Sequence, residues 1–482
     1  ISLFGEGAEF KRDFEKKFNE KKKQITDKYG DKIGVILVTA MTYPWMEPSM
    51  EQTVACITTR GGKNDHTPIW CKEHGLPCAV SVKGAPEFLK DGSLITYYGV
   101  GDTPAFYESR HQYSVTETQL EGLKPSSIPI RLIVSDASTA RSVCMRSYFP
   151  SLNIGRGSGL VRWEMLAAKL RVHPMAVMNY STLESDFLQL VGQGRMTKEE
   201  AVKTAESVAE FIQTESGELS PVEWYVKALA REIAGIVSPY YTDDINEPMV
   251  VRLPDFKTNE HADLLGGRAY EPVEENPMLG DRGAGKYLGA YQKAFLAIDL
   301  KALAYVINDM GYTNIHIEVP FVRTPDEMKE VARLVKESGI NIPLQMMFEL
   351  PVNISRATEF FKVSDGGQIG SNDLLQLEFG LDRSGGDILP WHIQHLQSRI
   401  ENLIQERNTT KPEFHLGLCG NLPSTNPEFA KWLVDAGIDE FSVTPDALIP
   451  ALLGVTGETP DGKQNITVYT AEGEVFVNGQ KA

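Results

Sequence analysis

A pair of glycines shortly before a histidine is the first feature of this chain that could carry out chemistry. The segment runs Thr58-Thr59-Arg60-Gly61-Gly62-Lys63-Asn64-Asp65-His66. Glycine has no Cβ, so the backbone N–H groups around it can approach a phosphate closely. An imidazole nitrogen can take up a phosphoryl group and release it again. The segment therefore allows a phosphohistidine at His66, although a glycine turn with a surface histidine is the commoner interpretation of so short a motif.

Arginines at the ends of expected strands or in loops form a second group. A guanidinium presents parallel N–H donors that match phosphate oxygens. The arginines in question are Arg162, Arg282 and Arg383. Taken singly, each is better explained by a solvated charge or an ion pair. Together they are the side chains that a phosphate-handling site requires.

Two carboxylates and a thiol also stand where apolar strands are expected to end. Glu349 closes the apolar segment 344–348, and Asp373 follows Gly370-Ser371-Asn372. Such a pair commonly holds Mg²⁺, and Mn²⁺ is a possible substitute; a helix cap or a loop ion pair is the competing interpretation. Cys419 ends another apolar segment and is followed by glycine. It is either a buried structural thiol or an acid and base at the site.

These residues need a scaffold, and the pattern predicts an α/β fold. Apolar segments alternate with segments of helical period over the second part of the chain, which is typical of a (β/α)8 barrel with its chemistry at the carboxyl ends of the strands. The expected strands are 130–134, 250–253, 315–319, 344–349, 367–369, 414–418 and 441–443. The stretch 183–236 has a purely helical pattern and is expected to be an insertion in the barrel.

The domain organisation expected from these patterns has four parts. A charged helix occupies 1–30, with Phe10, Phe14, Phe18 and Ile25 on one face that should lean on another domain or subunit. A small domain follows at 31–110, a linker at 111–127, and the barrel at 128–482.

Composition excludes several classes of protein. The 482 residues carry 65 acidic and 48 basic side chains, a net charge of −17, which argues against binding to nucleic acid or an anionic membrane. No apolar run is long enough to span a bilayer. The five cysteines are widely spaced without a C-x-x-C pair, so we expect a reducing, cytoplasmic setting.

Longer motifs in order along the chain resemble the phosphoenolpyruvate-utilising family, from about Gly34 to Leu453. They are V-R-L-P-D-F-K-T-N at 251–259, E-N-P-M-L-G-D-R-G-A at 275–284, V-P-F-V-R-T at 319–324 and I-G-S-N-D at 369–373. The resemblance implies that His66 is the phosphohistidine of a swivelling domain and that Arg162, Arg282 and Arg383 hold the phosphoryl group. It implies further that Glu349 and Asp373 bind Mg²⁺, that Asn372 orients the acceptor, and that Cys419 gives a proton to the enolate carbon.

The chain also departs from the family pattern. The ATP-grasp domain that charges the histidine in full synthases does not fit ahead of Gly34. Either the sequence is a fragment of a longer protein, or a separate subunit binds ATP, and the expectation taken from the resemblance is the separate subunit. Phe348 and Trp163 are bulkier than the residues usual at their positions, which would suit an aromatic acceptor. Asp281 adds a carboxylate beside Arg282 that could accept a hydroxyl proton, although an ion pair between the two is the plainer interpretation.

Two acceptors therefore stay open. We expect a phosphotransferase that passes a phosphoryl group from His66 to a phenol-type hydroxyl, as in the phenylphosphate synthase branch of the family. The alternative is pyruvate, as in the phosphoenolpyruvate synthase branch, and the retained Cys419 favours it because a phenol needs no proton transfer at carbon. A homo-oligomer formed through the barrel is also expected. A regulatory subunit without activity is disfavoured, since the charged residues of the site remain.

Overall fold

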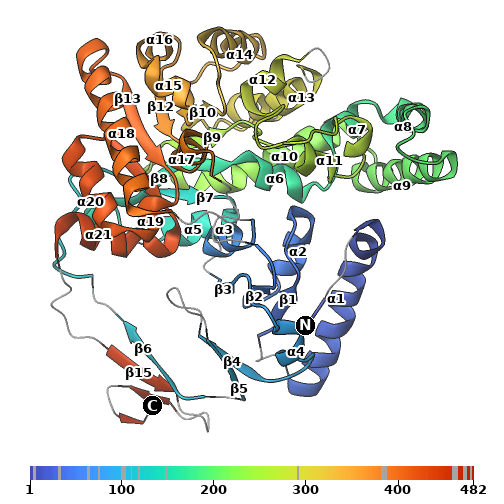
Figure 1. The fold of residues 1–482 in the computed structure, drawn as a ribbon, viewed down its shortest axis with the longest axis horizontal. Helices are drawn as coiled ribbons and strands as arrows, with labels where there is room; N and C mark the ends of the chain where they lie inside the picture. Colours follow the sequence, from blue (N-terminus) through green and yellow to red (C-terminus); the bar gives the residue numbers. More distant parts are fainter. Residues whose placement is uncertain are drawn as a thin grey trace. The chain divides into compact units, whose positions relative to one another are not determined.

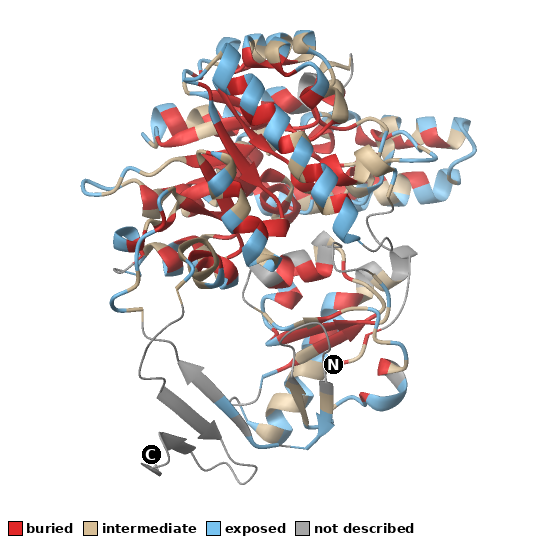
Figure 2. Ribbon diagram, turned by 60° about the vertical axis from the view of Figure 1, so that its left-hand side comes forward, coloured by how far each residue is buried: buried red, intermediate tan, exposed pale blue. Residues whose placement is uncertain are grey.

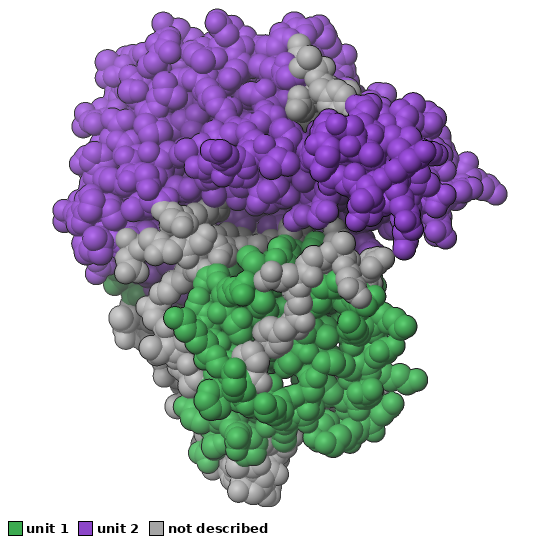
Figure 3. Space-filling view, turned by 45° about the vertical axis from the view of Figure 1, so that its right-hand side comes forward, with its two compact units in different colours: residues 1–125, 382–387, 456–482 green, residues 126–381, 388–455 purple. Residues whose placement is uncertain are grey.

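The structure is a computed structural model of the whole chain. It describes residues 1–3, 7–30, 34–61, 66–73, 76–98, 105–109, 111–117, 120–146, 149–289, 293–381, 388–458, 465–469, 475–477 and 480–481. The chain folds into two compact units (Figure 3). One unit contains residues 1–125 and 456–482, and the other contains residues 126–381 and 388–455. Within the described ranges, no helix combines the length and the apolar character that crossing a membrane requires.

The larger unit is a closed barrel of parallel strands (Figure 1). Its strands occur in the order β10-β11-β12-β13-β14-β7-β8-β9 around the barrel, so each strand pairs with its sequence neighbour and β14 closes on β7. Their bounds are β7 Ile130–Val134, β8 Ile154–Arg162, β9 Met249–Arg252, β10 Ile315–Val319, β11 Leu344–Phe348, β12 Gly366–Ile369, β13 His415–Cys419 and β14 Glu440–Val443. The prediction of a (β/α)8 barrel is confirmed.

Helices surround these strands, which are buried throughout most of their length (Figure 2). The helices are α5 Ala137–Cys144, α6 Trp163–Lys169, α7 Pro174–Met178, α8 Leu183–Gly192, α9 Lys198–Ser216, α10 Pro221–Val237, α11 Thr258–Ala262, α12 Gly283–Leu288, α13 Lys293–Ala304, α14 Pro325–Glu337, α15 Pro351–Ser355, α16 Ala357–Phe361, α17 Ser371–Phe379, α18 Pro390–Thr410, α19 Leu422–Thr425, α20 Pro427–Ala436 and α21 Leu448–Thr456. Helix α14 shows why they begin where they do. Thr324 caps it by accepting from the N–H of Glu327, and Pro325 occupies its first turn.

The stretch expected to be a helical insertion is helical in the structure. It contains α8, α9 and α10, of which α9 begins with a capping box at Thr197 and α10 with Pro221 after its cap Ser220. The remaining predicted strands agree with the observed ones to within a residue or two at each end. Strand β8 was not predicted, because its sequence I-G-R-G-S-G-L-V-R is interrupted by glycines that obscure the strand pattern.

The smaller unit contains a parallel sheet of three strands in the order β1-β2-β3, namely β1 Ile36–Thr39, β2 Ala55–Thr58 and β3 Cys78–Ala79. Four helices accompany it: α1 Gly7–Tyr29, α2 Glu47–Met50, α3 His66–Glu73 and α4 Ala85–Phe88. A hairpin of β4 Ile95–Tyr98 and β5 Ala105–Glu108 belongs to the same unit. The core of the sheet includes Val38, Ile57 and Ala79.

Helix α1 corrects one expectation. Its apolar face was expected to lean on another domain or subunit, but Phe14 and Phe18 are buried within the small unit itself. The rings of Phe10 and Phe14 pack edge-on against Trp45, with ring centroids 6.3 and 5.4 Å away. The apolar stripe is therefore part of the small unit's own core.

The chain termini correct a second expectation. The segment 111–127 was expected to be a linker, and the barrel was expected to continue to residue 482. Instead, β6 Tyr113–Glu117 pairs antiparallel with β15 Asn465–Tyr469, which continues to β16 Val475–Val477 and β17 Gln480–Lys481. The barrel unit ends with helix α21 because the last strand segments bond to a strand more than 300 residues earlier, a pairing that no local pattern reveals.

Candidate functional site at the carboxyl end of the barrel

Arg282 lies at the centre of the candidate site. It caps α12, and its side chain is only 1% exposed. Its Nε and Nη2 donate to the two carboxylate oxygens of Asp255 over 2.9 and 2.6 Å, and its Nη1 donates to Asp373 over 3.1 Å. Burial lowers the pKa of Arg282, but Asp255 and Asp373 outweigh it, so the pKa lies well above its ordinary value. The guanidinium is thus a fixed positive charge.

Arg252, at the end of β9, is a second buried cation at the same place. Its Nη1 lies 3.1 Å from Asp255, and its Nη2 pairs with Glu164, which follows β8. Asp255 therefore bridges two guanidinium groups. Such a pair of guanidinium groups is a strong anion-binding arrangement once a ligand competes with the bridging carboxylate.

Phe321 holds the other side of the site. It follows β10 with a positive φ of 51°, a conformation that costs an ordinary residue about 1–3 kcal/mol. Its backbone N–H donates to Oε1 of Glu349 over 2.6 Å. Its ring lies under Arg282, whose guanidinium carbon is 4.2 Å from the ring centroid. The strained residue thereby positions both a carboxylate and a cation of the site.

Glycine is needed at position 283 for the same packing. Gly283 has a φ of 59°, and a Cβ there would lie 2.5 Å from the Cβ of Phe321 and 2.5 Å from the carbonyl oxygen of Pro320. Arg323 fixes the preceding loop by donating to the carbonyls of Arg282 and Gly280 over 3.2 and 2.6 Å. The position of Arg282 is therefore set by backbone as well as by carboxylates.

The carboxylates fit a divalent cation. Glu349 is fully buried, and its Oε2 has no hydrogen-bond partner among the described residues. The pKa of Glu349 is raised to about 8, mainly by burial and also by the charges of Asp373 and Asp255, with Arg282 and Arg252 opposing them. A buried carboxylate oxygen without a donor, next to a second carboxylate, is stabilised by a hard cation such as Mg²⁺.

Cys419 ends β13 and faces the interior of the barrel. It packs in an apolar cluster with Ile133, Leu160 and Met347 and is 3% exposed. Burial raises the pKa of Cys419 well above its ordinary value, the charge of Glu318 adds to this, and Arg252 opposes it. The thiol is therefore protonated at neutral pH and can act as a proton donor.

The other predicted residues of the barrel have different positions. Arg162 is buried at the end of β8 and acts electrostatically on Cys419. Asn372 lies in the first turn of α17 next to Asp373, and its Oδ1 accepts from the N–H of Asn421 over 3.2 Å. Asp281 is partly buried on the loop before α12, where burial raises its pKa and Lys286 opposes this. The guanidinium of Arg282 donates to Asp255 and Asp373.

The expectation that Phe348 and Trp163 line a pocket for an aromatic acceptor requires a correction. The Phe348 ring packs against Phe361 and Phe414 at centroid distances of 5.6 and 6.1 Å, in the layer between the barrel and its helices. Neighbouring residues of a strand point to opposite faces, so Phe348 points outward because Glu349 and Met347 point inward. Trp163 is fully buried and lies beside Asp299 of α13. Neither side chain contributes an aromatic lining to the mouth of the barrel.

His66 and Arg383 lie outside what the structure describes in detail. Helix α3 begins at His66, but its side chain and residues 62–65 are not among the described parts, and the same holds for residues 382–387 with Arg383. The flanks of the histidine segment are described. The hydroxyl of Ser81 donates to the carbonyl of Gly61 over 2.6 Å, and the hydroxyls of Thr42 and Thr67 lie 2.7 Å apart.

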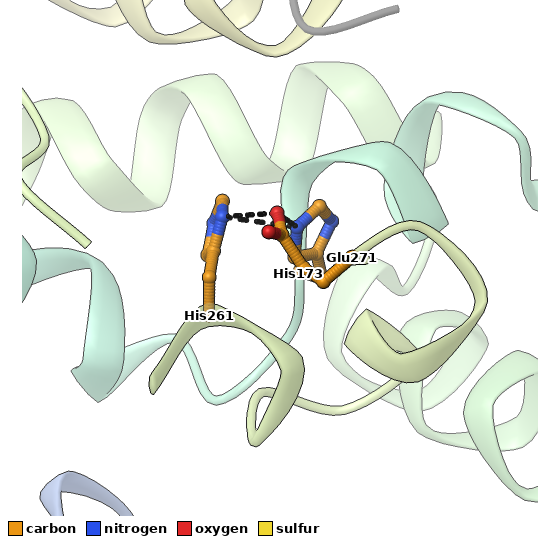
Figure 4. Close-up of side chains that lie close together, drawn as sticks. All are labelled: His173, His261 and Glu271. Carbon is orange, nitrogen blue, oxygen red and sulfur yellow. Dashed lines mark hydrogen bonds and ion pairs between the residues drawn. The ribbon is translucent and has the colours of Figure 1, made fainter. Parts of the chain in front are cut away.

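A buried cluster next to the site could be mistaken for a metal centre. His173, His261 and Glu271 converge on one point (Figure 4), and their donor atoms lie within 4.8 Å of one another. The N–H of Met175 donates to Nδ1 of His173 over 3.1 Å, so the proton of this ring lies on Nε2, 3.1 Å from Glu271. Lys286 also donates to Glu271 over 2.6 Å. Glu271 is thus satisfied by protons, and the cluster fixes α12 behind Arg282.

Several residues of the site were not singled out from the sequence. Arg252 and Asp255 lie in the motif at 251–259, and Phe321 lies in the motif at 319–324. A rule that collects polar and charged residues at the end of each predicted strand and directly after it would have selected Arg252 and Asp255. The role of Phe321 depends on its positive φ, which cannot be predicted from the residue type.

Comparison with known proteins agrees with this geometry. The family model of the PEP-utilising enzyme, PEP-binding domain, matches residues 156–456, and the model of the PEP-utilising enzyme, mobile domain, matches residues 32–99. The chain therefore belongs to the PEP-utilising enzyme family, and the resemblance noted from its motifs is confirmed. The match to the PEP-binding domain includes all of the barrel residues described above, namely Arg252, Asp255, Arg282, Glu349, Asp373 and Cys419. The match to the mobile domain includes His66.

The curated relatives described next are all phosphoenolpyruvate synthases. The phosphoenolpyruvate synthase of Neisseria meningitidis is 34% identical over 434 residues, which cover 88% of this chain and 51% of that protein. The synthase of Aquifex aeolicus is 34% identical over 457 residues, 88% and 52% of the two chains, and that of Escherichia coli is 33% identical over 434 residues, 88% and 50%. This chain thus spans about half the length of the curated relatives it matches.

A solved aldolase/citrate lyase family protein from Burkholderia cenocepacia aligns with 13% identity and a TM-score of 0.28, over 47% of this chain and 75% of that one. An alignment this weak supports no inference.

Proposed function

We propose that the chain passes a phosphoryl group between His66 and pyruvate, in the manner of the phosphoenolpyruvate synthases that it resembles. The observation that carries the proposal is the group of Arg252, Arg282, Glu349 and Asp373 at the carboxyl end of the barrel, where cations and carboxylates meet in a buried setting. The phosphoryl donor we propose for His66 is ATP bound to a separate ATP-grasp subunit. The aromatic acceptor is not carried forward, since Phe348 and Trp163 lie away from the mouth.

The chemistry assigned to each group follows from its charge state. In the direction of phosphoenolpyruvate formation, Cys419 as a thiolate takes a proton from the methyl group of pyruvate. The electron pair of the broken C–H bond forms the enolate, whose oxygen attacks phosphorus. The N–P bond to His66 breaks, and the imidazole keeps the electron pair.

The arginines and carboxylates serve this transfer without changing covalently. The guanidinium groups of Arg252 and Arg282 stabilise charge on the phosphoryl oxygens. A Mg²⁺ ion held by Glu349 and Asp373 would supply further positive charge to the phosphoryl and enolate oxygens. In the reverse direction, the protonated thiol of Cys419 gives its proton to the enolate carbon, which agrees with its raised pKa.

The reverse direction provides a test that needs no partner. The purified chain is mixed with phosphoenolpyruvate and Mg²⁺, and pyruvate release and phosphohistidine are measured, the latter by intact mass and by its lability in acid. We expect pyruvate in proportion to the chain and a phosphorylated protein. The variant His66→Ala should form neither.

Phenyl phosphate replaces phosphoenolpyruvate in a parallel sample. Phosphorylation of His66 by phenyl phosphate but not by phosphoenolpyruvate would contradict the proposal and restore the aromatic acceptor. Failure of both donors, in a folded protein, would remove phosphoryl transfer at this site altogether.

A further inference from the structure

Arg282 and Asp255, the buried ion pair at the centre of the site, are attached to two short helices. Arg282 caps α12, and Asp255 lies three residues before α11. The two helices contain six and five residues, so neither is long enough to be stable without packing against other elements. Contacts outside the pair must therefore set the position of the guanidinium relative to the carboxylate.

The carboxylate of Glu271 binds both helices at once (Figure 4). Its Oε2 accepts from Nζ of Lys286 over 2.6 Å. Lys286 lies in α12, four residues after Arg282 and therefore about one helical turn away from it. The Oε1 of Glu271 lies 2.8 Å from Nδ1 of His261 in α11. One side chain thus connects the helix of Arg282 to the helix that follows Asp255.

Both sequence neighbours of Asp255 are also held. The ring of Phe256 stacks on the ring of His261, with centroids 4.6 Å apart and an angle of 4° between the ring planes. The hydroxyl of Tyr287, which lies in α12, donates to the carbonyl of Pro254. The backbone on each side of Asp255 is therefore tied either to the ligands of Glu271 or directly to α12.

The turn that carries Glu271 is packed closely enough to serve as a fixed point. A Cβ on Gly267 would lie 2.3 Å from the carbonyl oxygen of His261, and a Cβ on Gly266 would lie 2.6 Å from the Cβ of Ala176 in α7. Gly266 has a φ of 84°, which favours glycine. The N–H of Glu271 donates to the carbonyl of Gly267 over 3.0 Å. The turn is thus held against both α7 and α11.

The charges of this cluster balance. The side chains of Lys286 and Glu271 form a buried ion pair, 2% and 1% exposed. Burial lowers the pKa of His173, and burial followed by the neighbouring His173 and Lys286 lowers the pKa of His261 further, so both rings are neutral at pH 7. Replacing a buried ion pair with apolar residues of similar size is often neutral or stabilising. Stability alone therefore gives little reason for such a pair at this place.

We propose that Glu271 is a positioning residue for phosphoryl-group binding, which keeps Arg282 aligned with Asp255 by holding Lys286 of α12 and His261 of α11 with one carboxylate. The proposal rests on the proposed function, in which Arg282 binds the phosphoryl oxygens. Without Glu271, α12 and α11 lose their common ligand, and the guanidinium can shift. A misplacement of about 1 Å can cost roughly a hundredfold in rate.

A double variant tests this role without leaving a buried charge unpaired. Glu271→Met combined with Lys286→Met removes both charges at similar side-chain volume. The rate at which phosphoenolpyruvate and Mg²⁺ phosphorylate the full chain is measured in single turnover at increasing phosphoenolpyruvate. We expect the half-saturating concentration to rise at least tenfold and the maximum rate to change less, because Cys419 and Glu349 lie outside the cluster. Glu271→Gln, which keeps the length and one acceptor oxygen, should show a smaller rise.

Inorganic phosphate provides a second measurement that does not depend on catalysis. Its dissociation constant is measured by isothermal titration calorimetry, and the binding that Arg282→Met abolishes is assigned to this site. That binding should weaken at least tenfold in the double variant. Asp439→Asn is the matched control. Asp439 pairs with Arg407 over 2.6 Å directly before β14, at the opposite end of the barrel, so its loss should lower stability and leave phosphate binding within about twofold.

Urea unfolding establishes that each variant is folded. Wild-type affinity for phosphate and phosphoenolpyruvate in the folded double variant would overturn the positioning role and leave the proposed function intact. Equal weakening in Asp439→Asn would also overturn it, since the effect would then be a general loss of stability. If the double variant does not fold, unchanged affinity in Glu271→Gln overturns the role, and weaker affinity supports it. No phosphorylation of the wild type, together with weaker phosphate binding in the double variant, would overturn the proposed function and support the positioning role.

Discussion

Asp255 is the carboxylate whose removal tests the site most directly. It accepts from Arg282 over 2.9 and 2.6 Å and lies 3.1 Å from Nη1 of Arg252. In Asp255→Asn the shape is kept, but two buried guanidinium groups lose the negative charge they share. Removing one partner of a buried ion pair costs about 3–5 kcal/mol. We expect the free energy of unfolding of the barrel to fall by about that amount.

Phosphate should restore much of this loss. An anion between the two guanidinium groups replaces the missing charge, and a ligand at 100 times its dissociation constant contributes about 2.7 kcal/mol. Urea unfolding followed by tryptophan fluorescence, with phosphate or with chloride at equal ionic strength, measures both effects. The gain from phosphate should be larger in Asp255→Asn than in the wild type, where the carboxylate competes with the anion.

Asp326→Asn provides the matched control. This aspartate pairs with Lys329 over 2.7 Å on the surface of α14, with its side chain 88% exposed. Loss of an exposed pair should change stability far less than Asp255→Asn does, with no specific response to phosphate. A loss of stability in Asp255→Asn no larger than in this control would contradict the shared ion pair, and equal effects of phosphate and chloride on Asp255→Asn would contradict anion binding between the two arginines.

Further predictions concern residues that support the site. Burial raises the pKa of Asp299 to about 8. The folded chain therefore keeps this proton while the unfolded chain releases it near pH 4, and stability should fall by up to about 1.4 kcal/mol per pH unit between about pH 4 and pH 8. Asp299→Asn should remove this contribution, seen as the difference between the two proteins in urea unfolding across that range. Phe348→Ala should cost about 3–5 kcal/mol of stability, because the ring packs among aromatic side chains outside the barrel interior, while phosphorylation of the folded protein by phosphoenolpyruvate changes little. Loss of that phosphorylation in the folded variant would place the ring in the site. Gly283→Ala should cost more than about 1 kcal/mol, since φ is 59° and a Cβ would lie 2.5 Å from Phe321, and unchanged stability in urea would contradict this packing.

Local patterns were enough to predict most of the barrel. Segments such as 315–319 and 344–349 are short, apolar and followed by capped helices, so their secondary structure is set by nearby residues. The same patterns placed Glu349 and Cys419 at strand ends. Strand β8 was not predicted because its glycines interrupt the alternation of apolar and polar residues. In the structure it is mostly buried and pairs with β7.

The orientation of Phe348 was wrong for a reason that the sequence itself contains. A residue next to an inward-facing glutamate in a strand must face outward, and counting along β11 from Glu349 gives that result. The aromatic acceptor was inferred from residue size without this count. The strand was therefore predicted correctly, but the direction of the Phe348 side chain was not.

Motifs and periodicity are local properties of the chain, so the sequence was enough to identify the family, the alternation of strands and helices, and the residue types that handle a phosphoryl group. The tertiary contacts of the barrel place Asp255 between two arginines, the N–H of Phe321 against Glu349, and Cys419 against Met347 of another strand. These contacts join residues far apart in the chain. Closure of the barrel and the register of its strands bring these residues together, and a pattern within one segment cannot specify a contact with another segment.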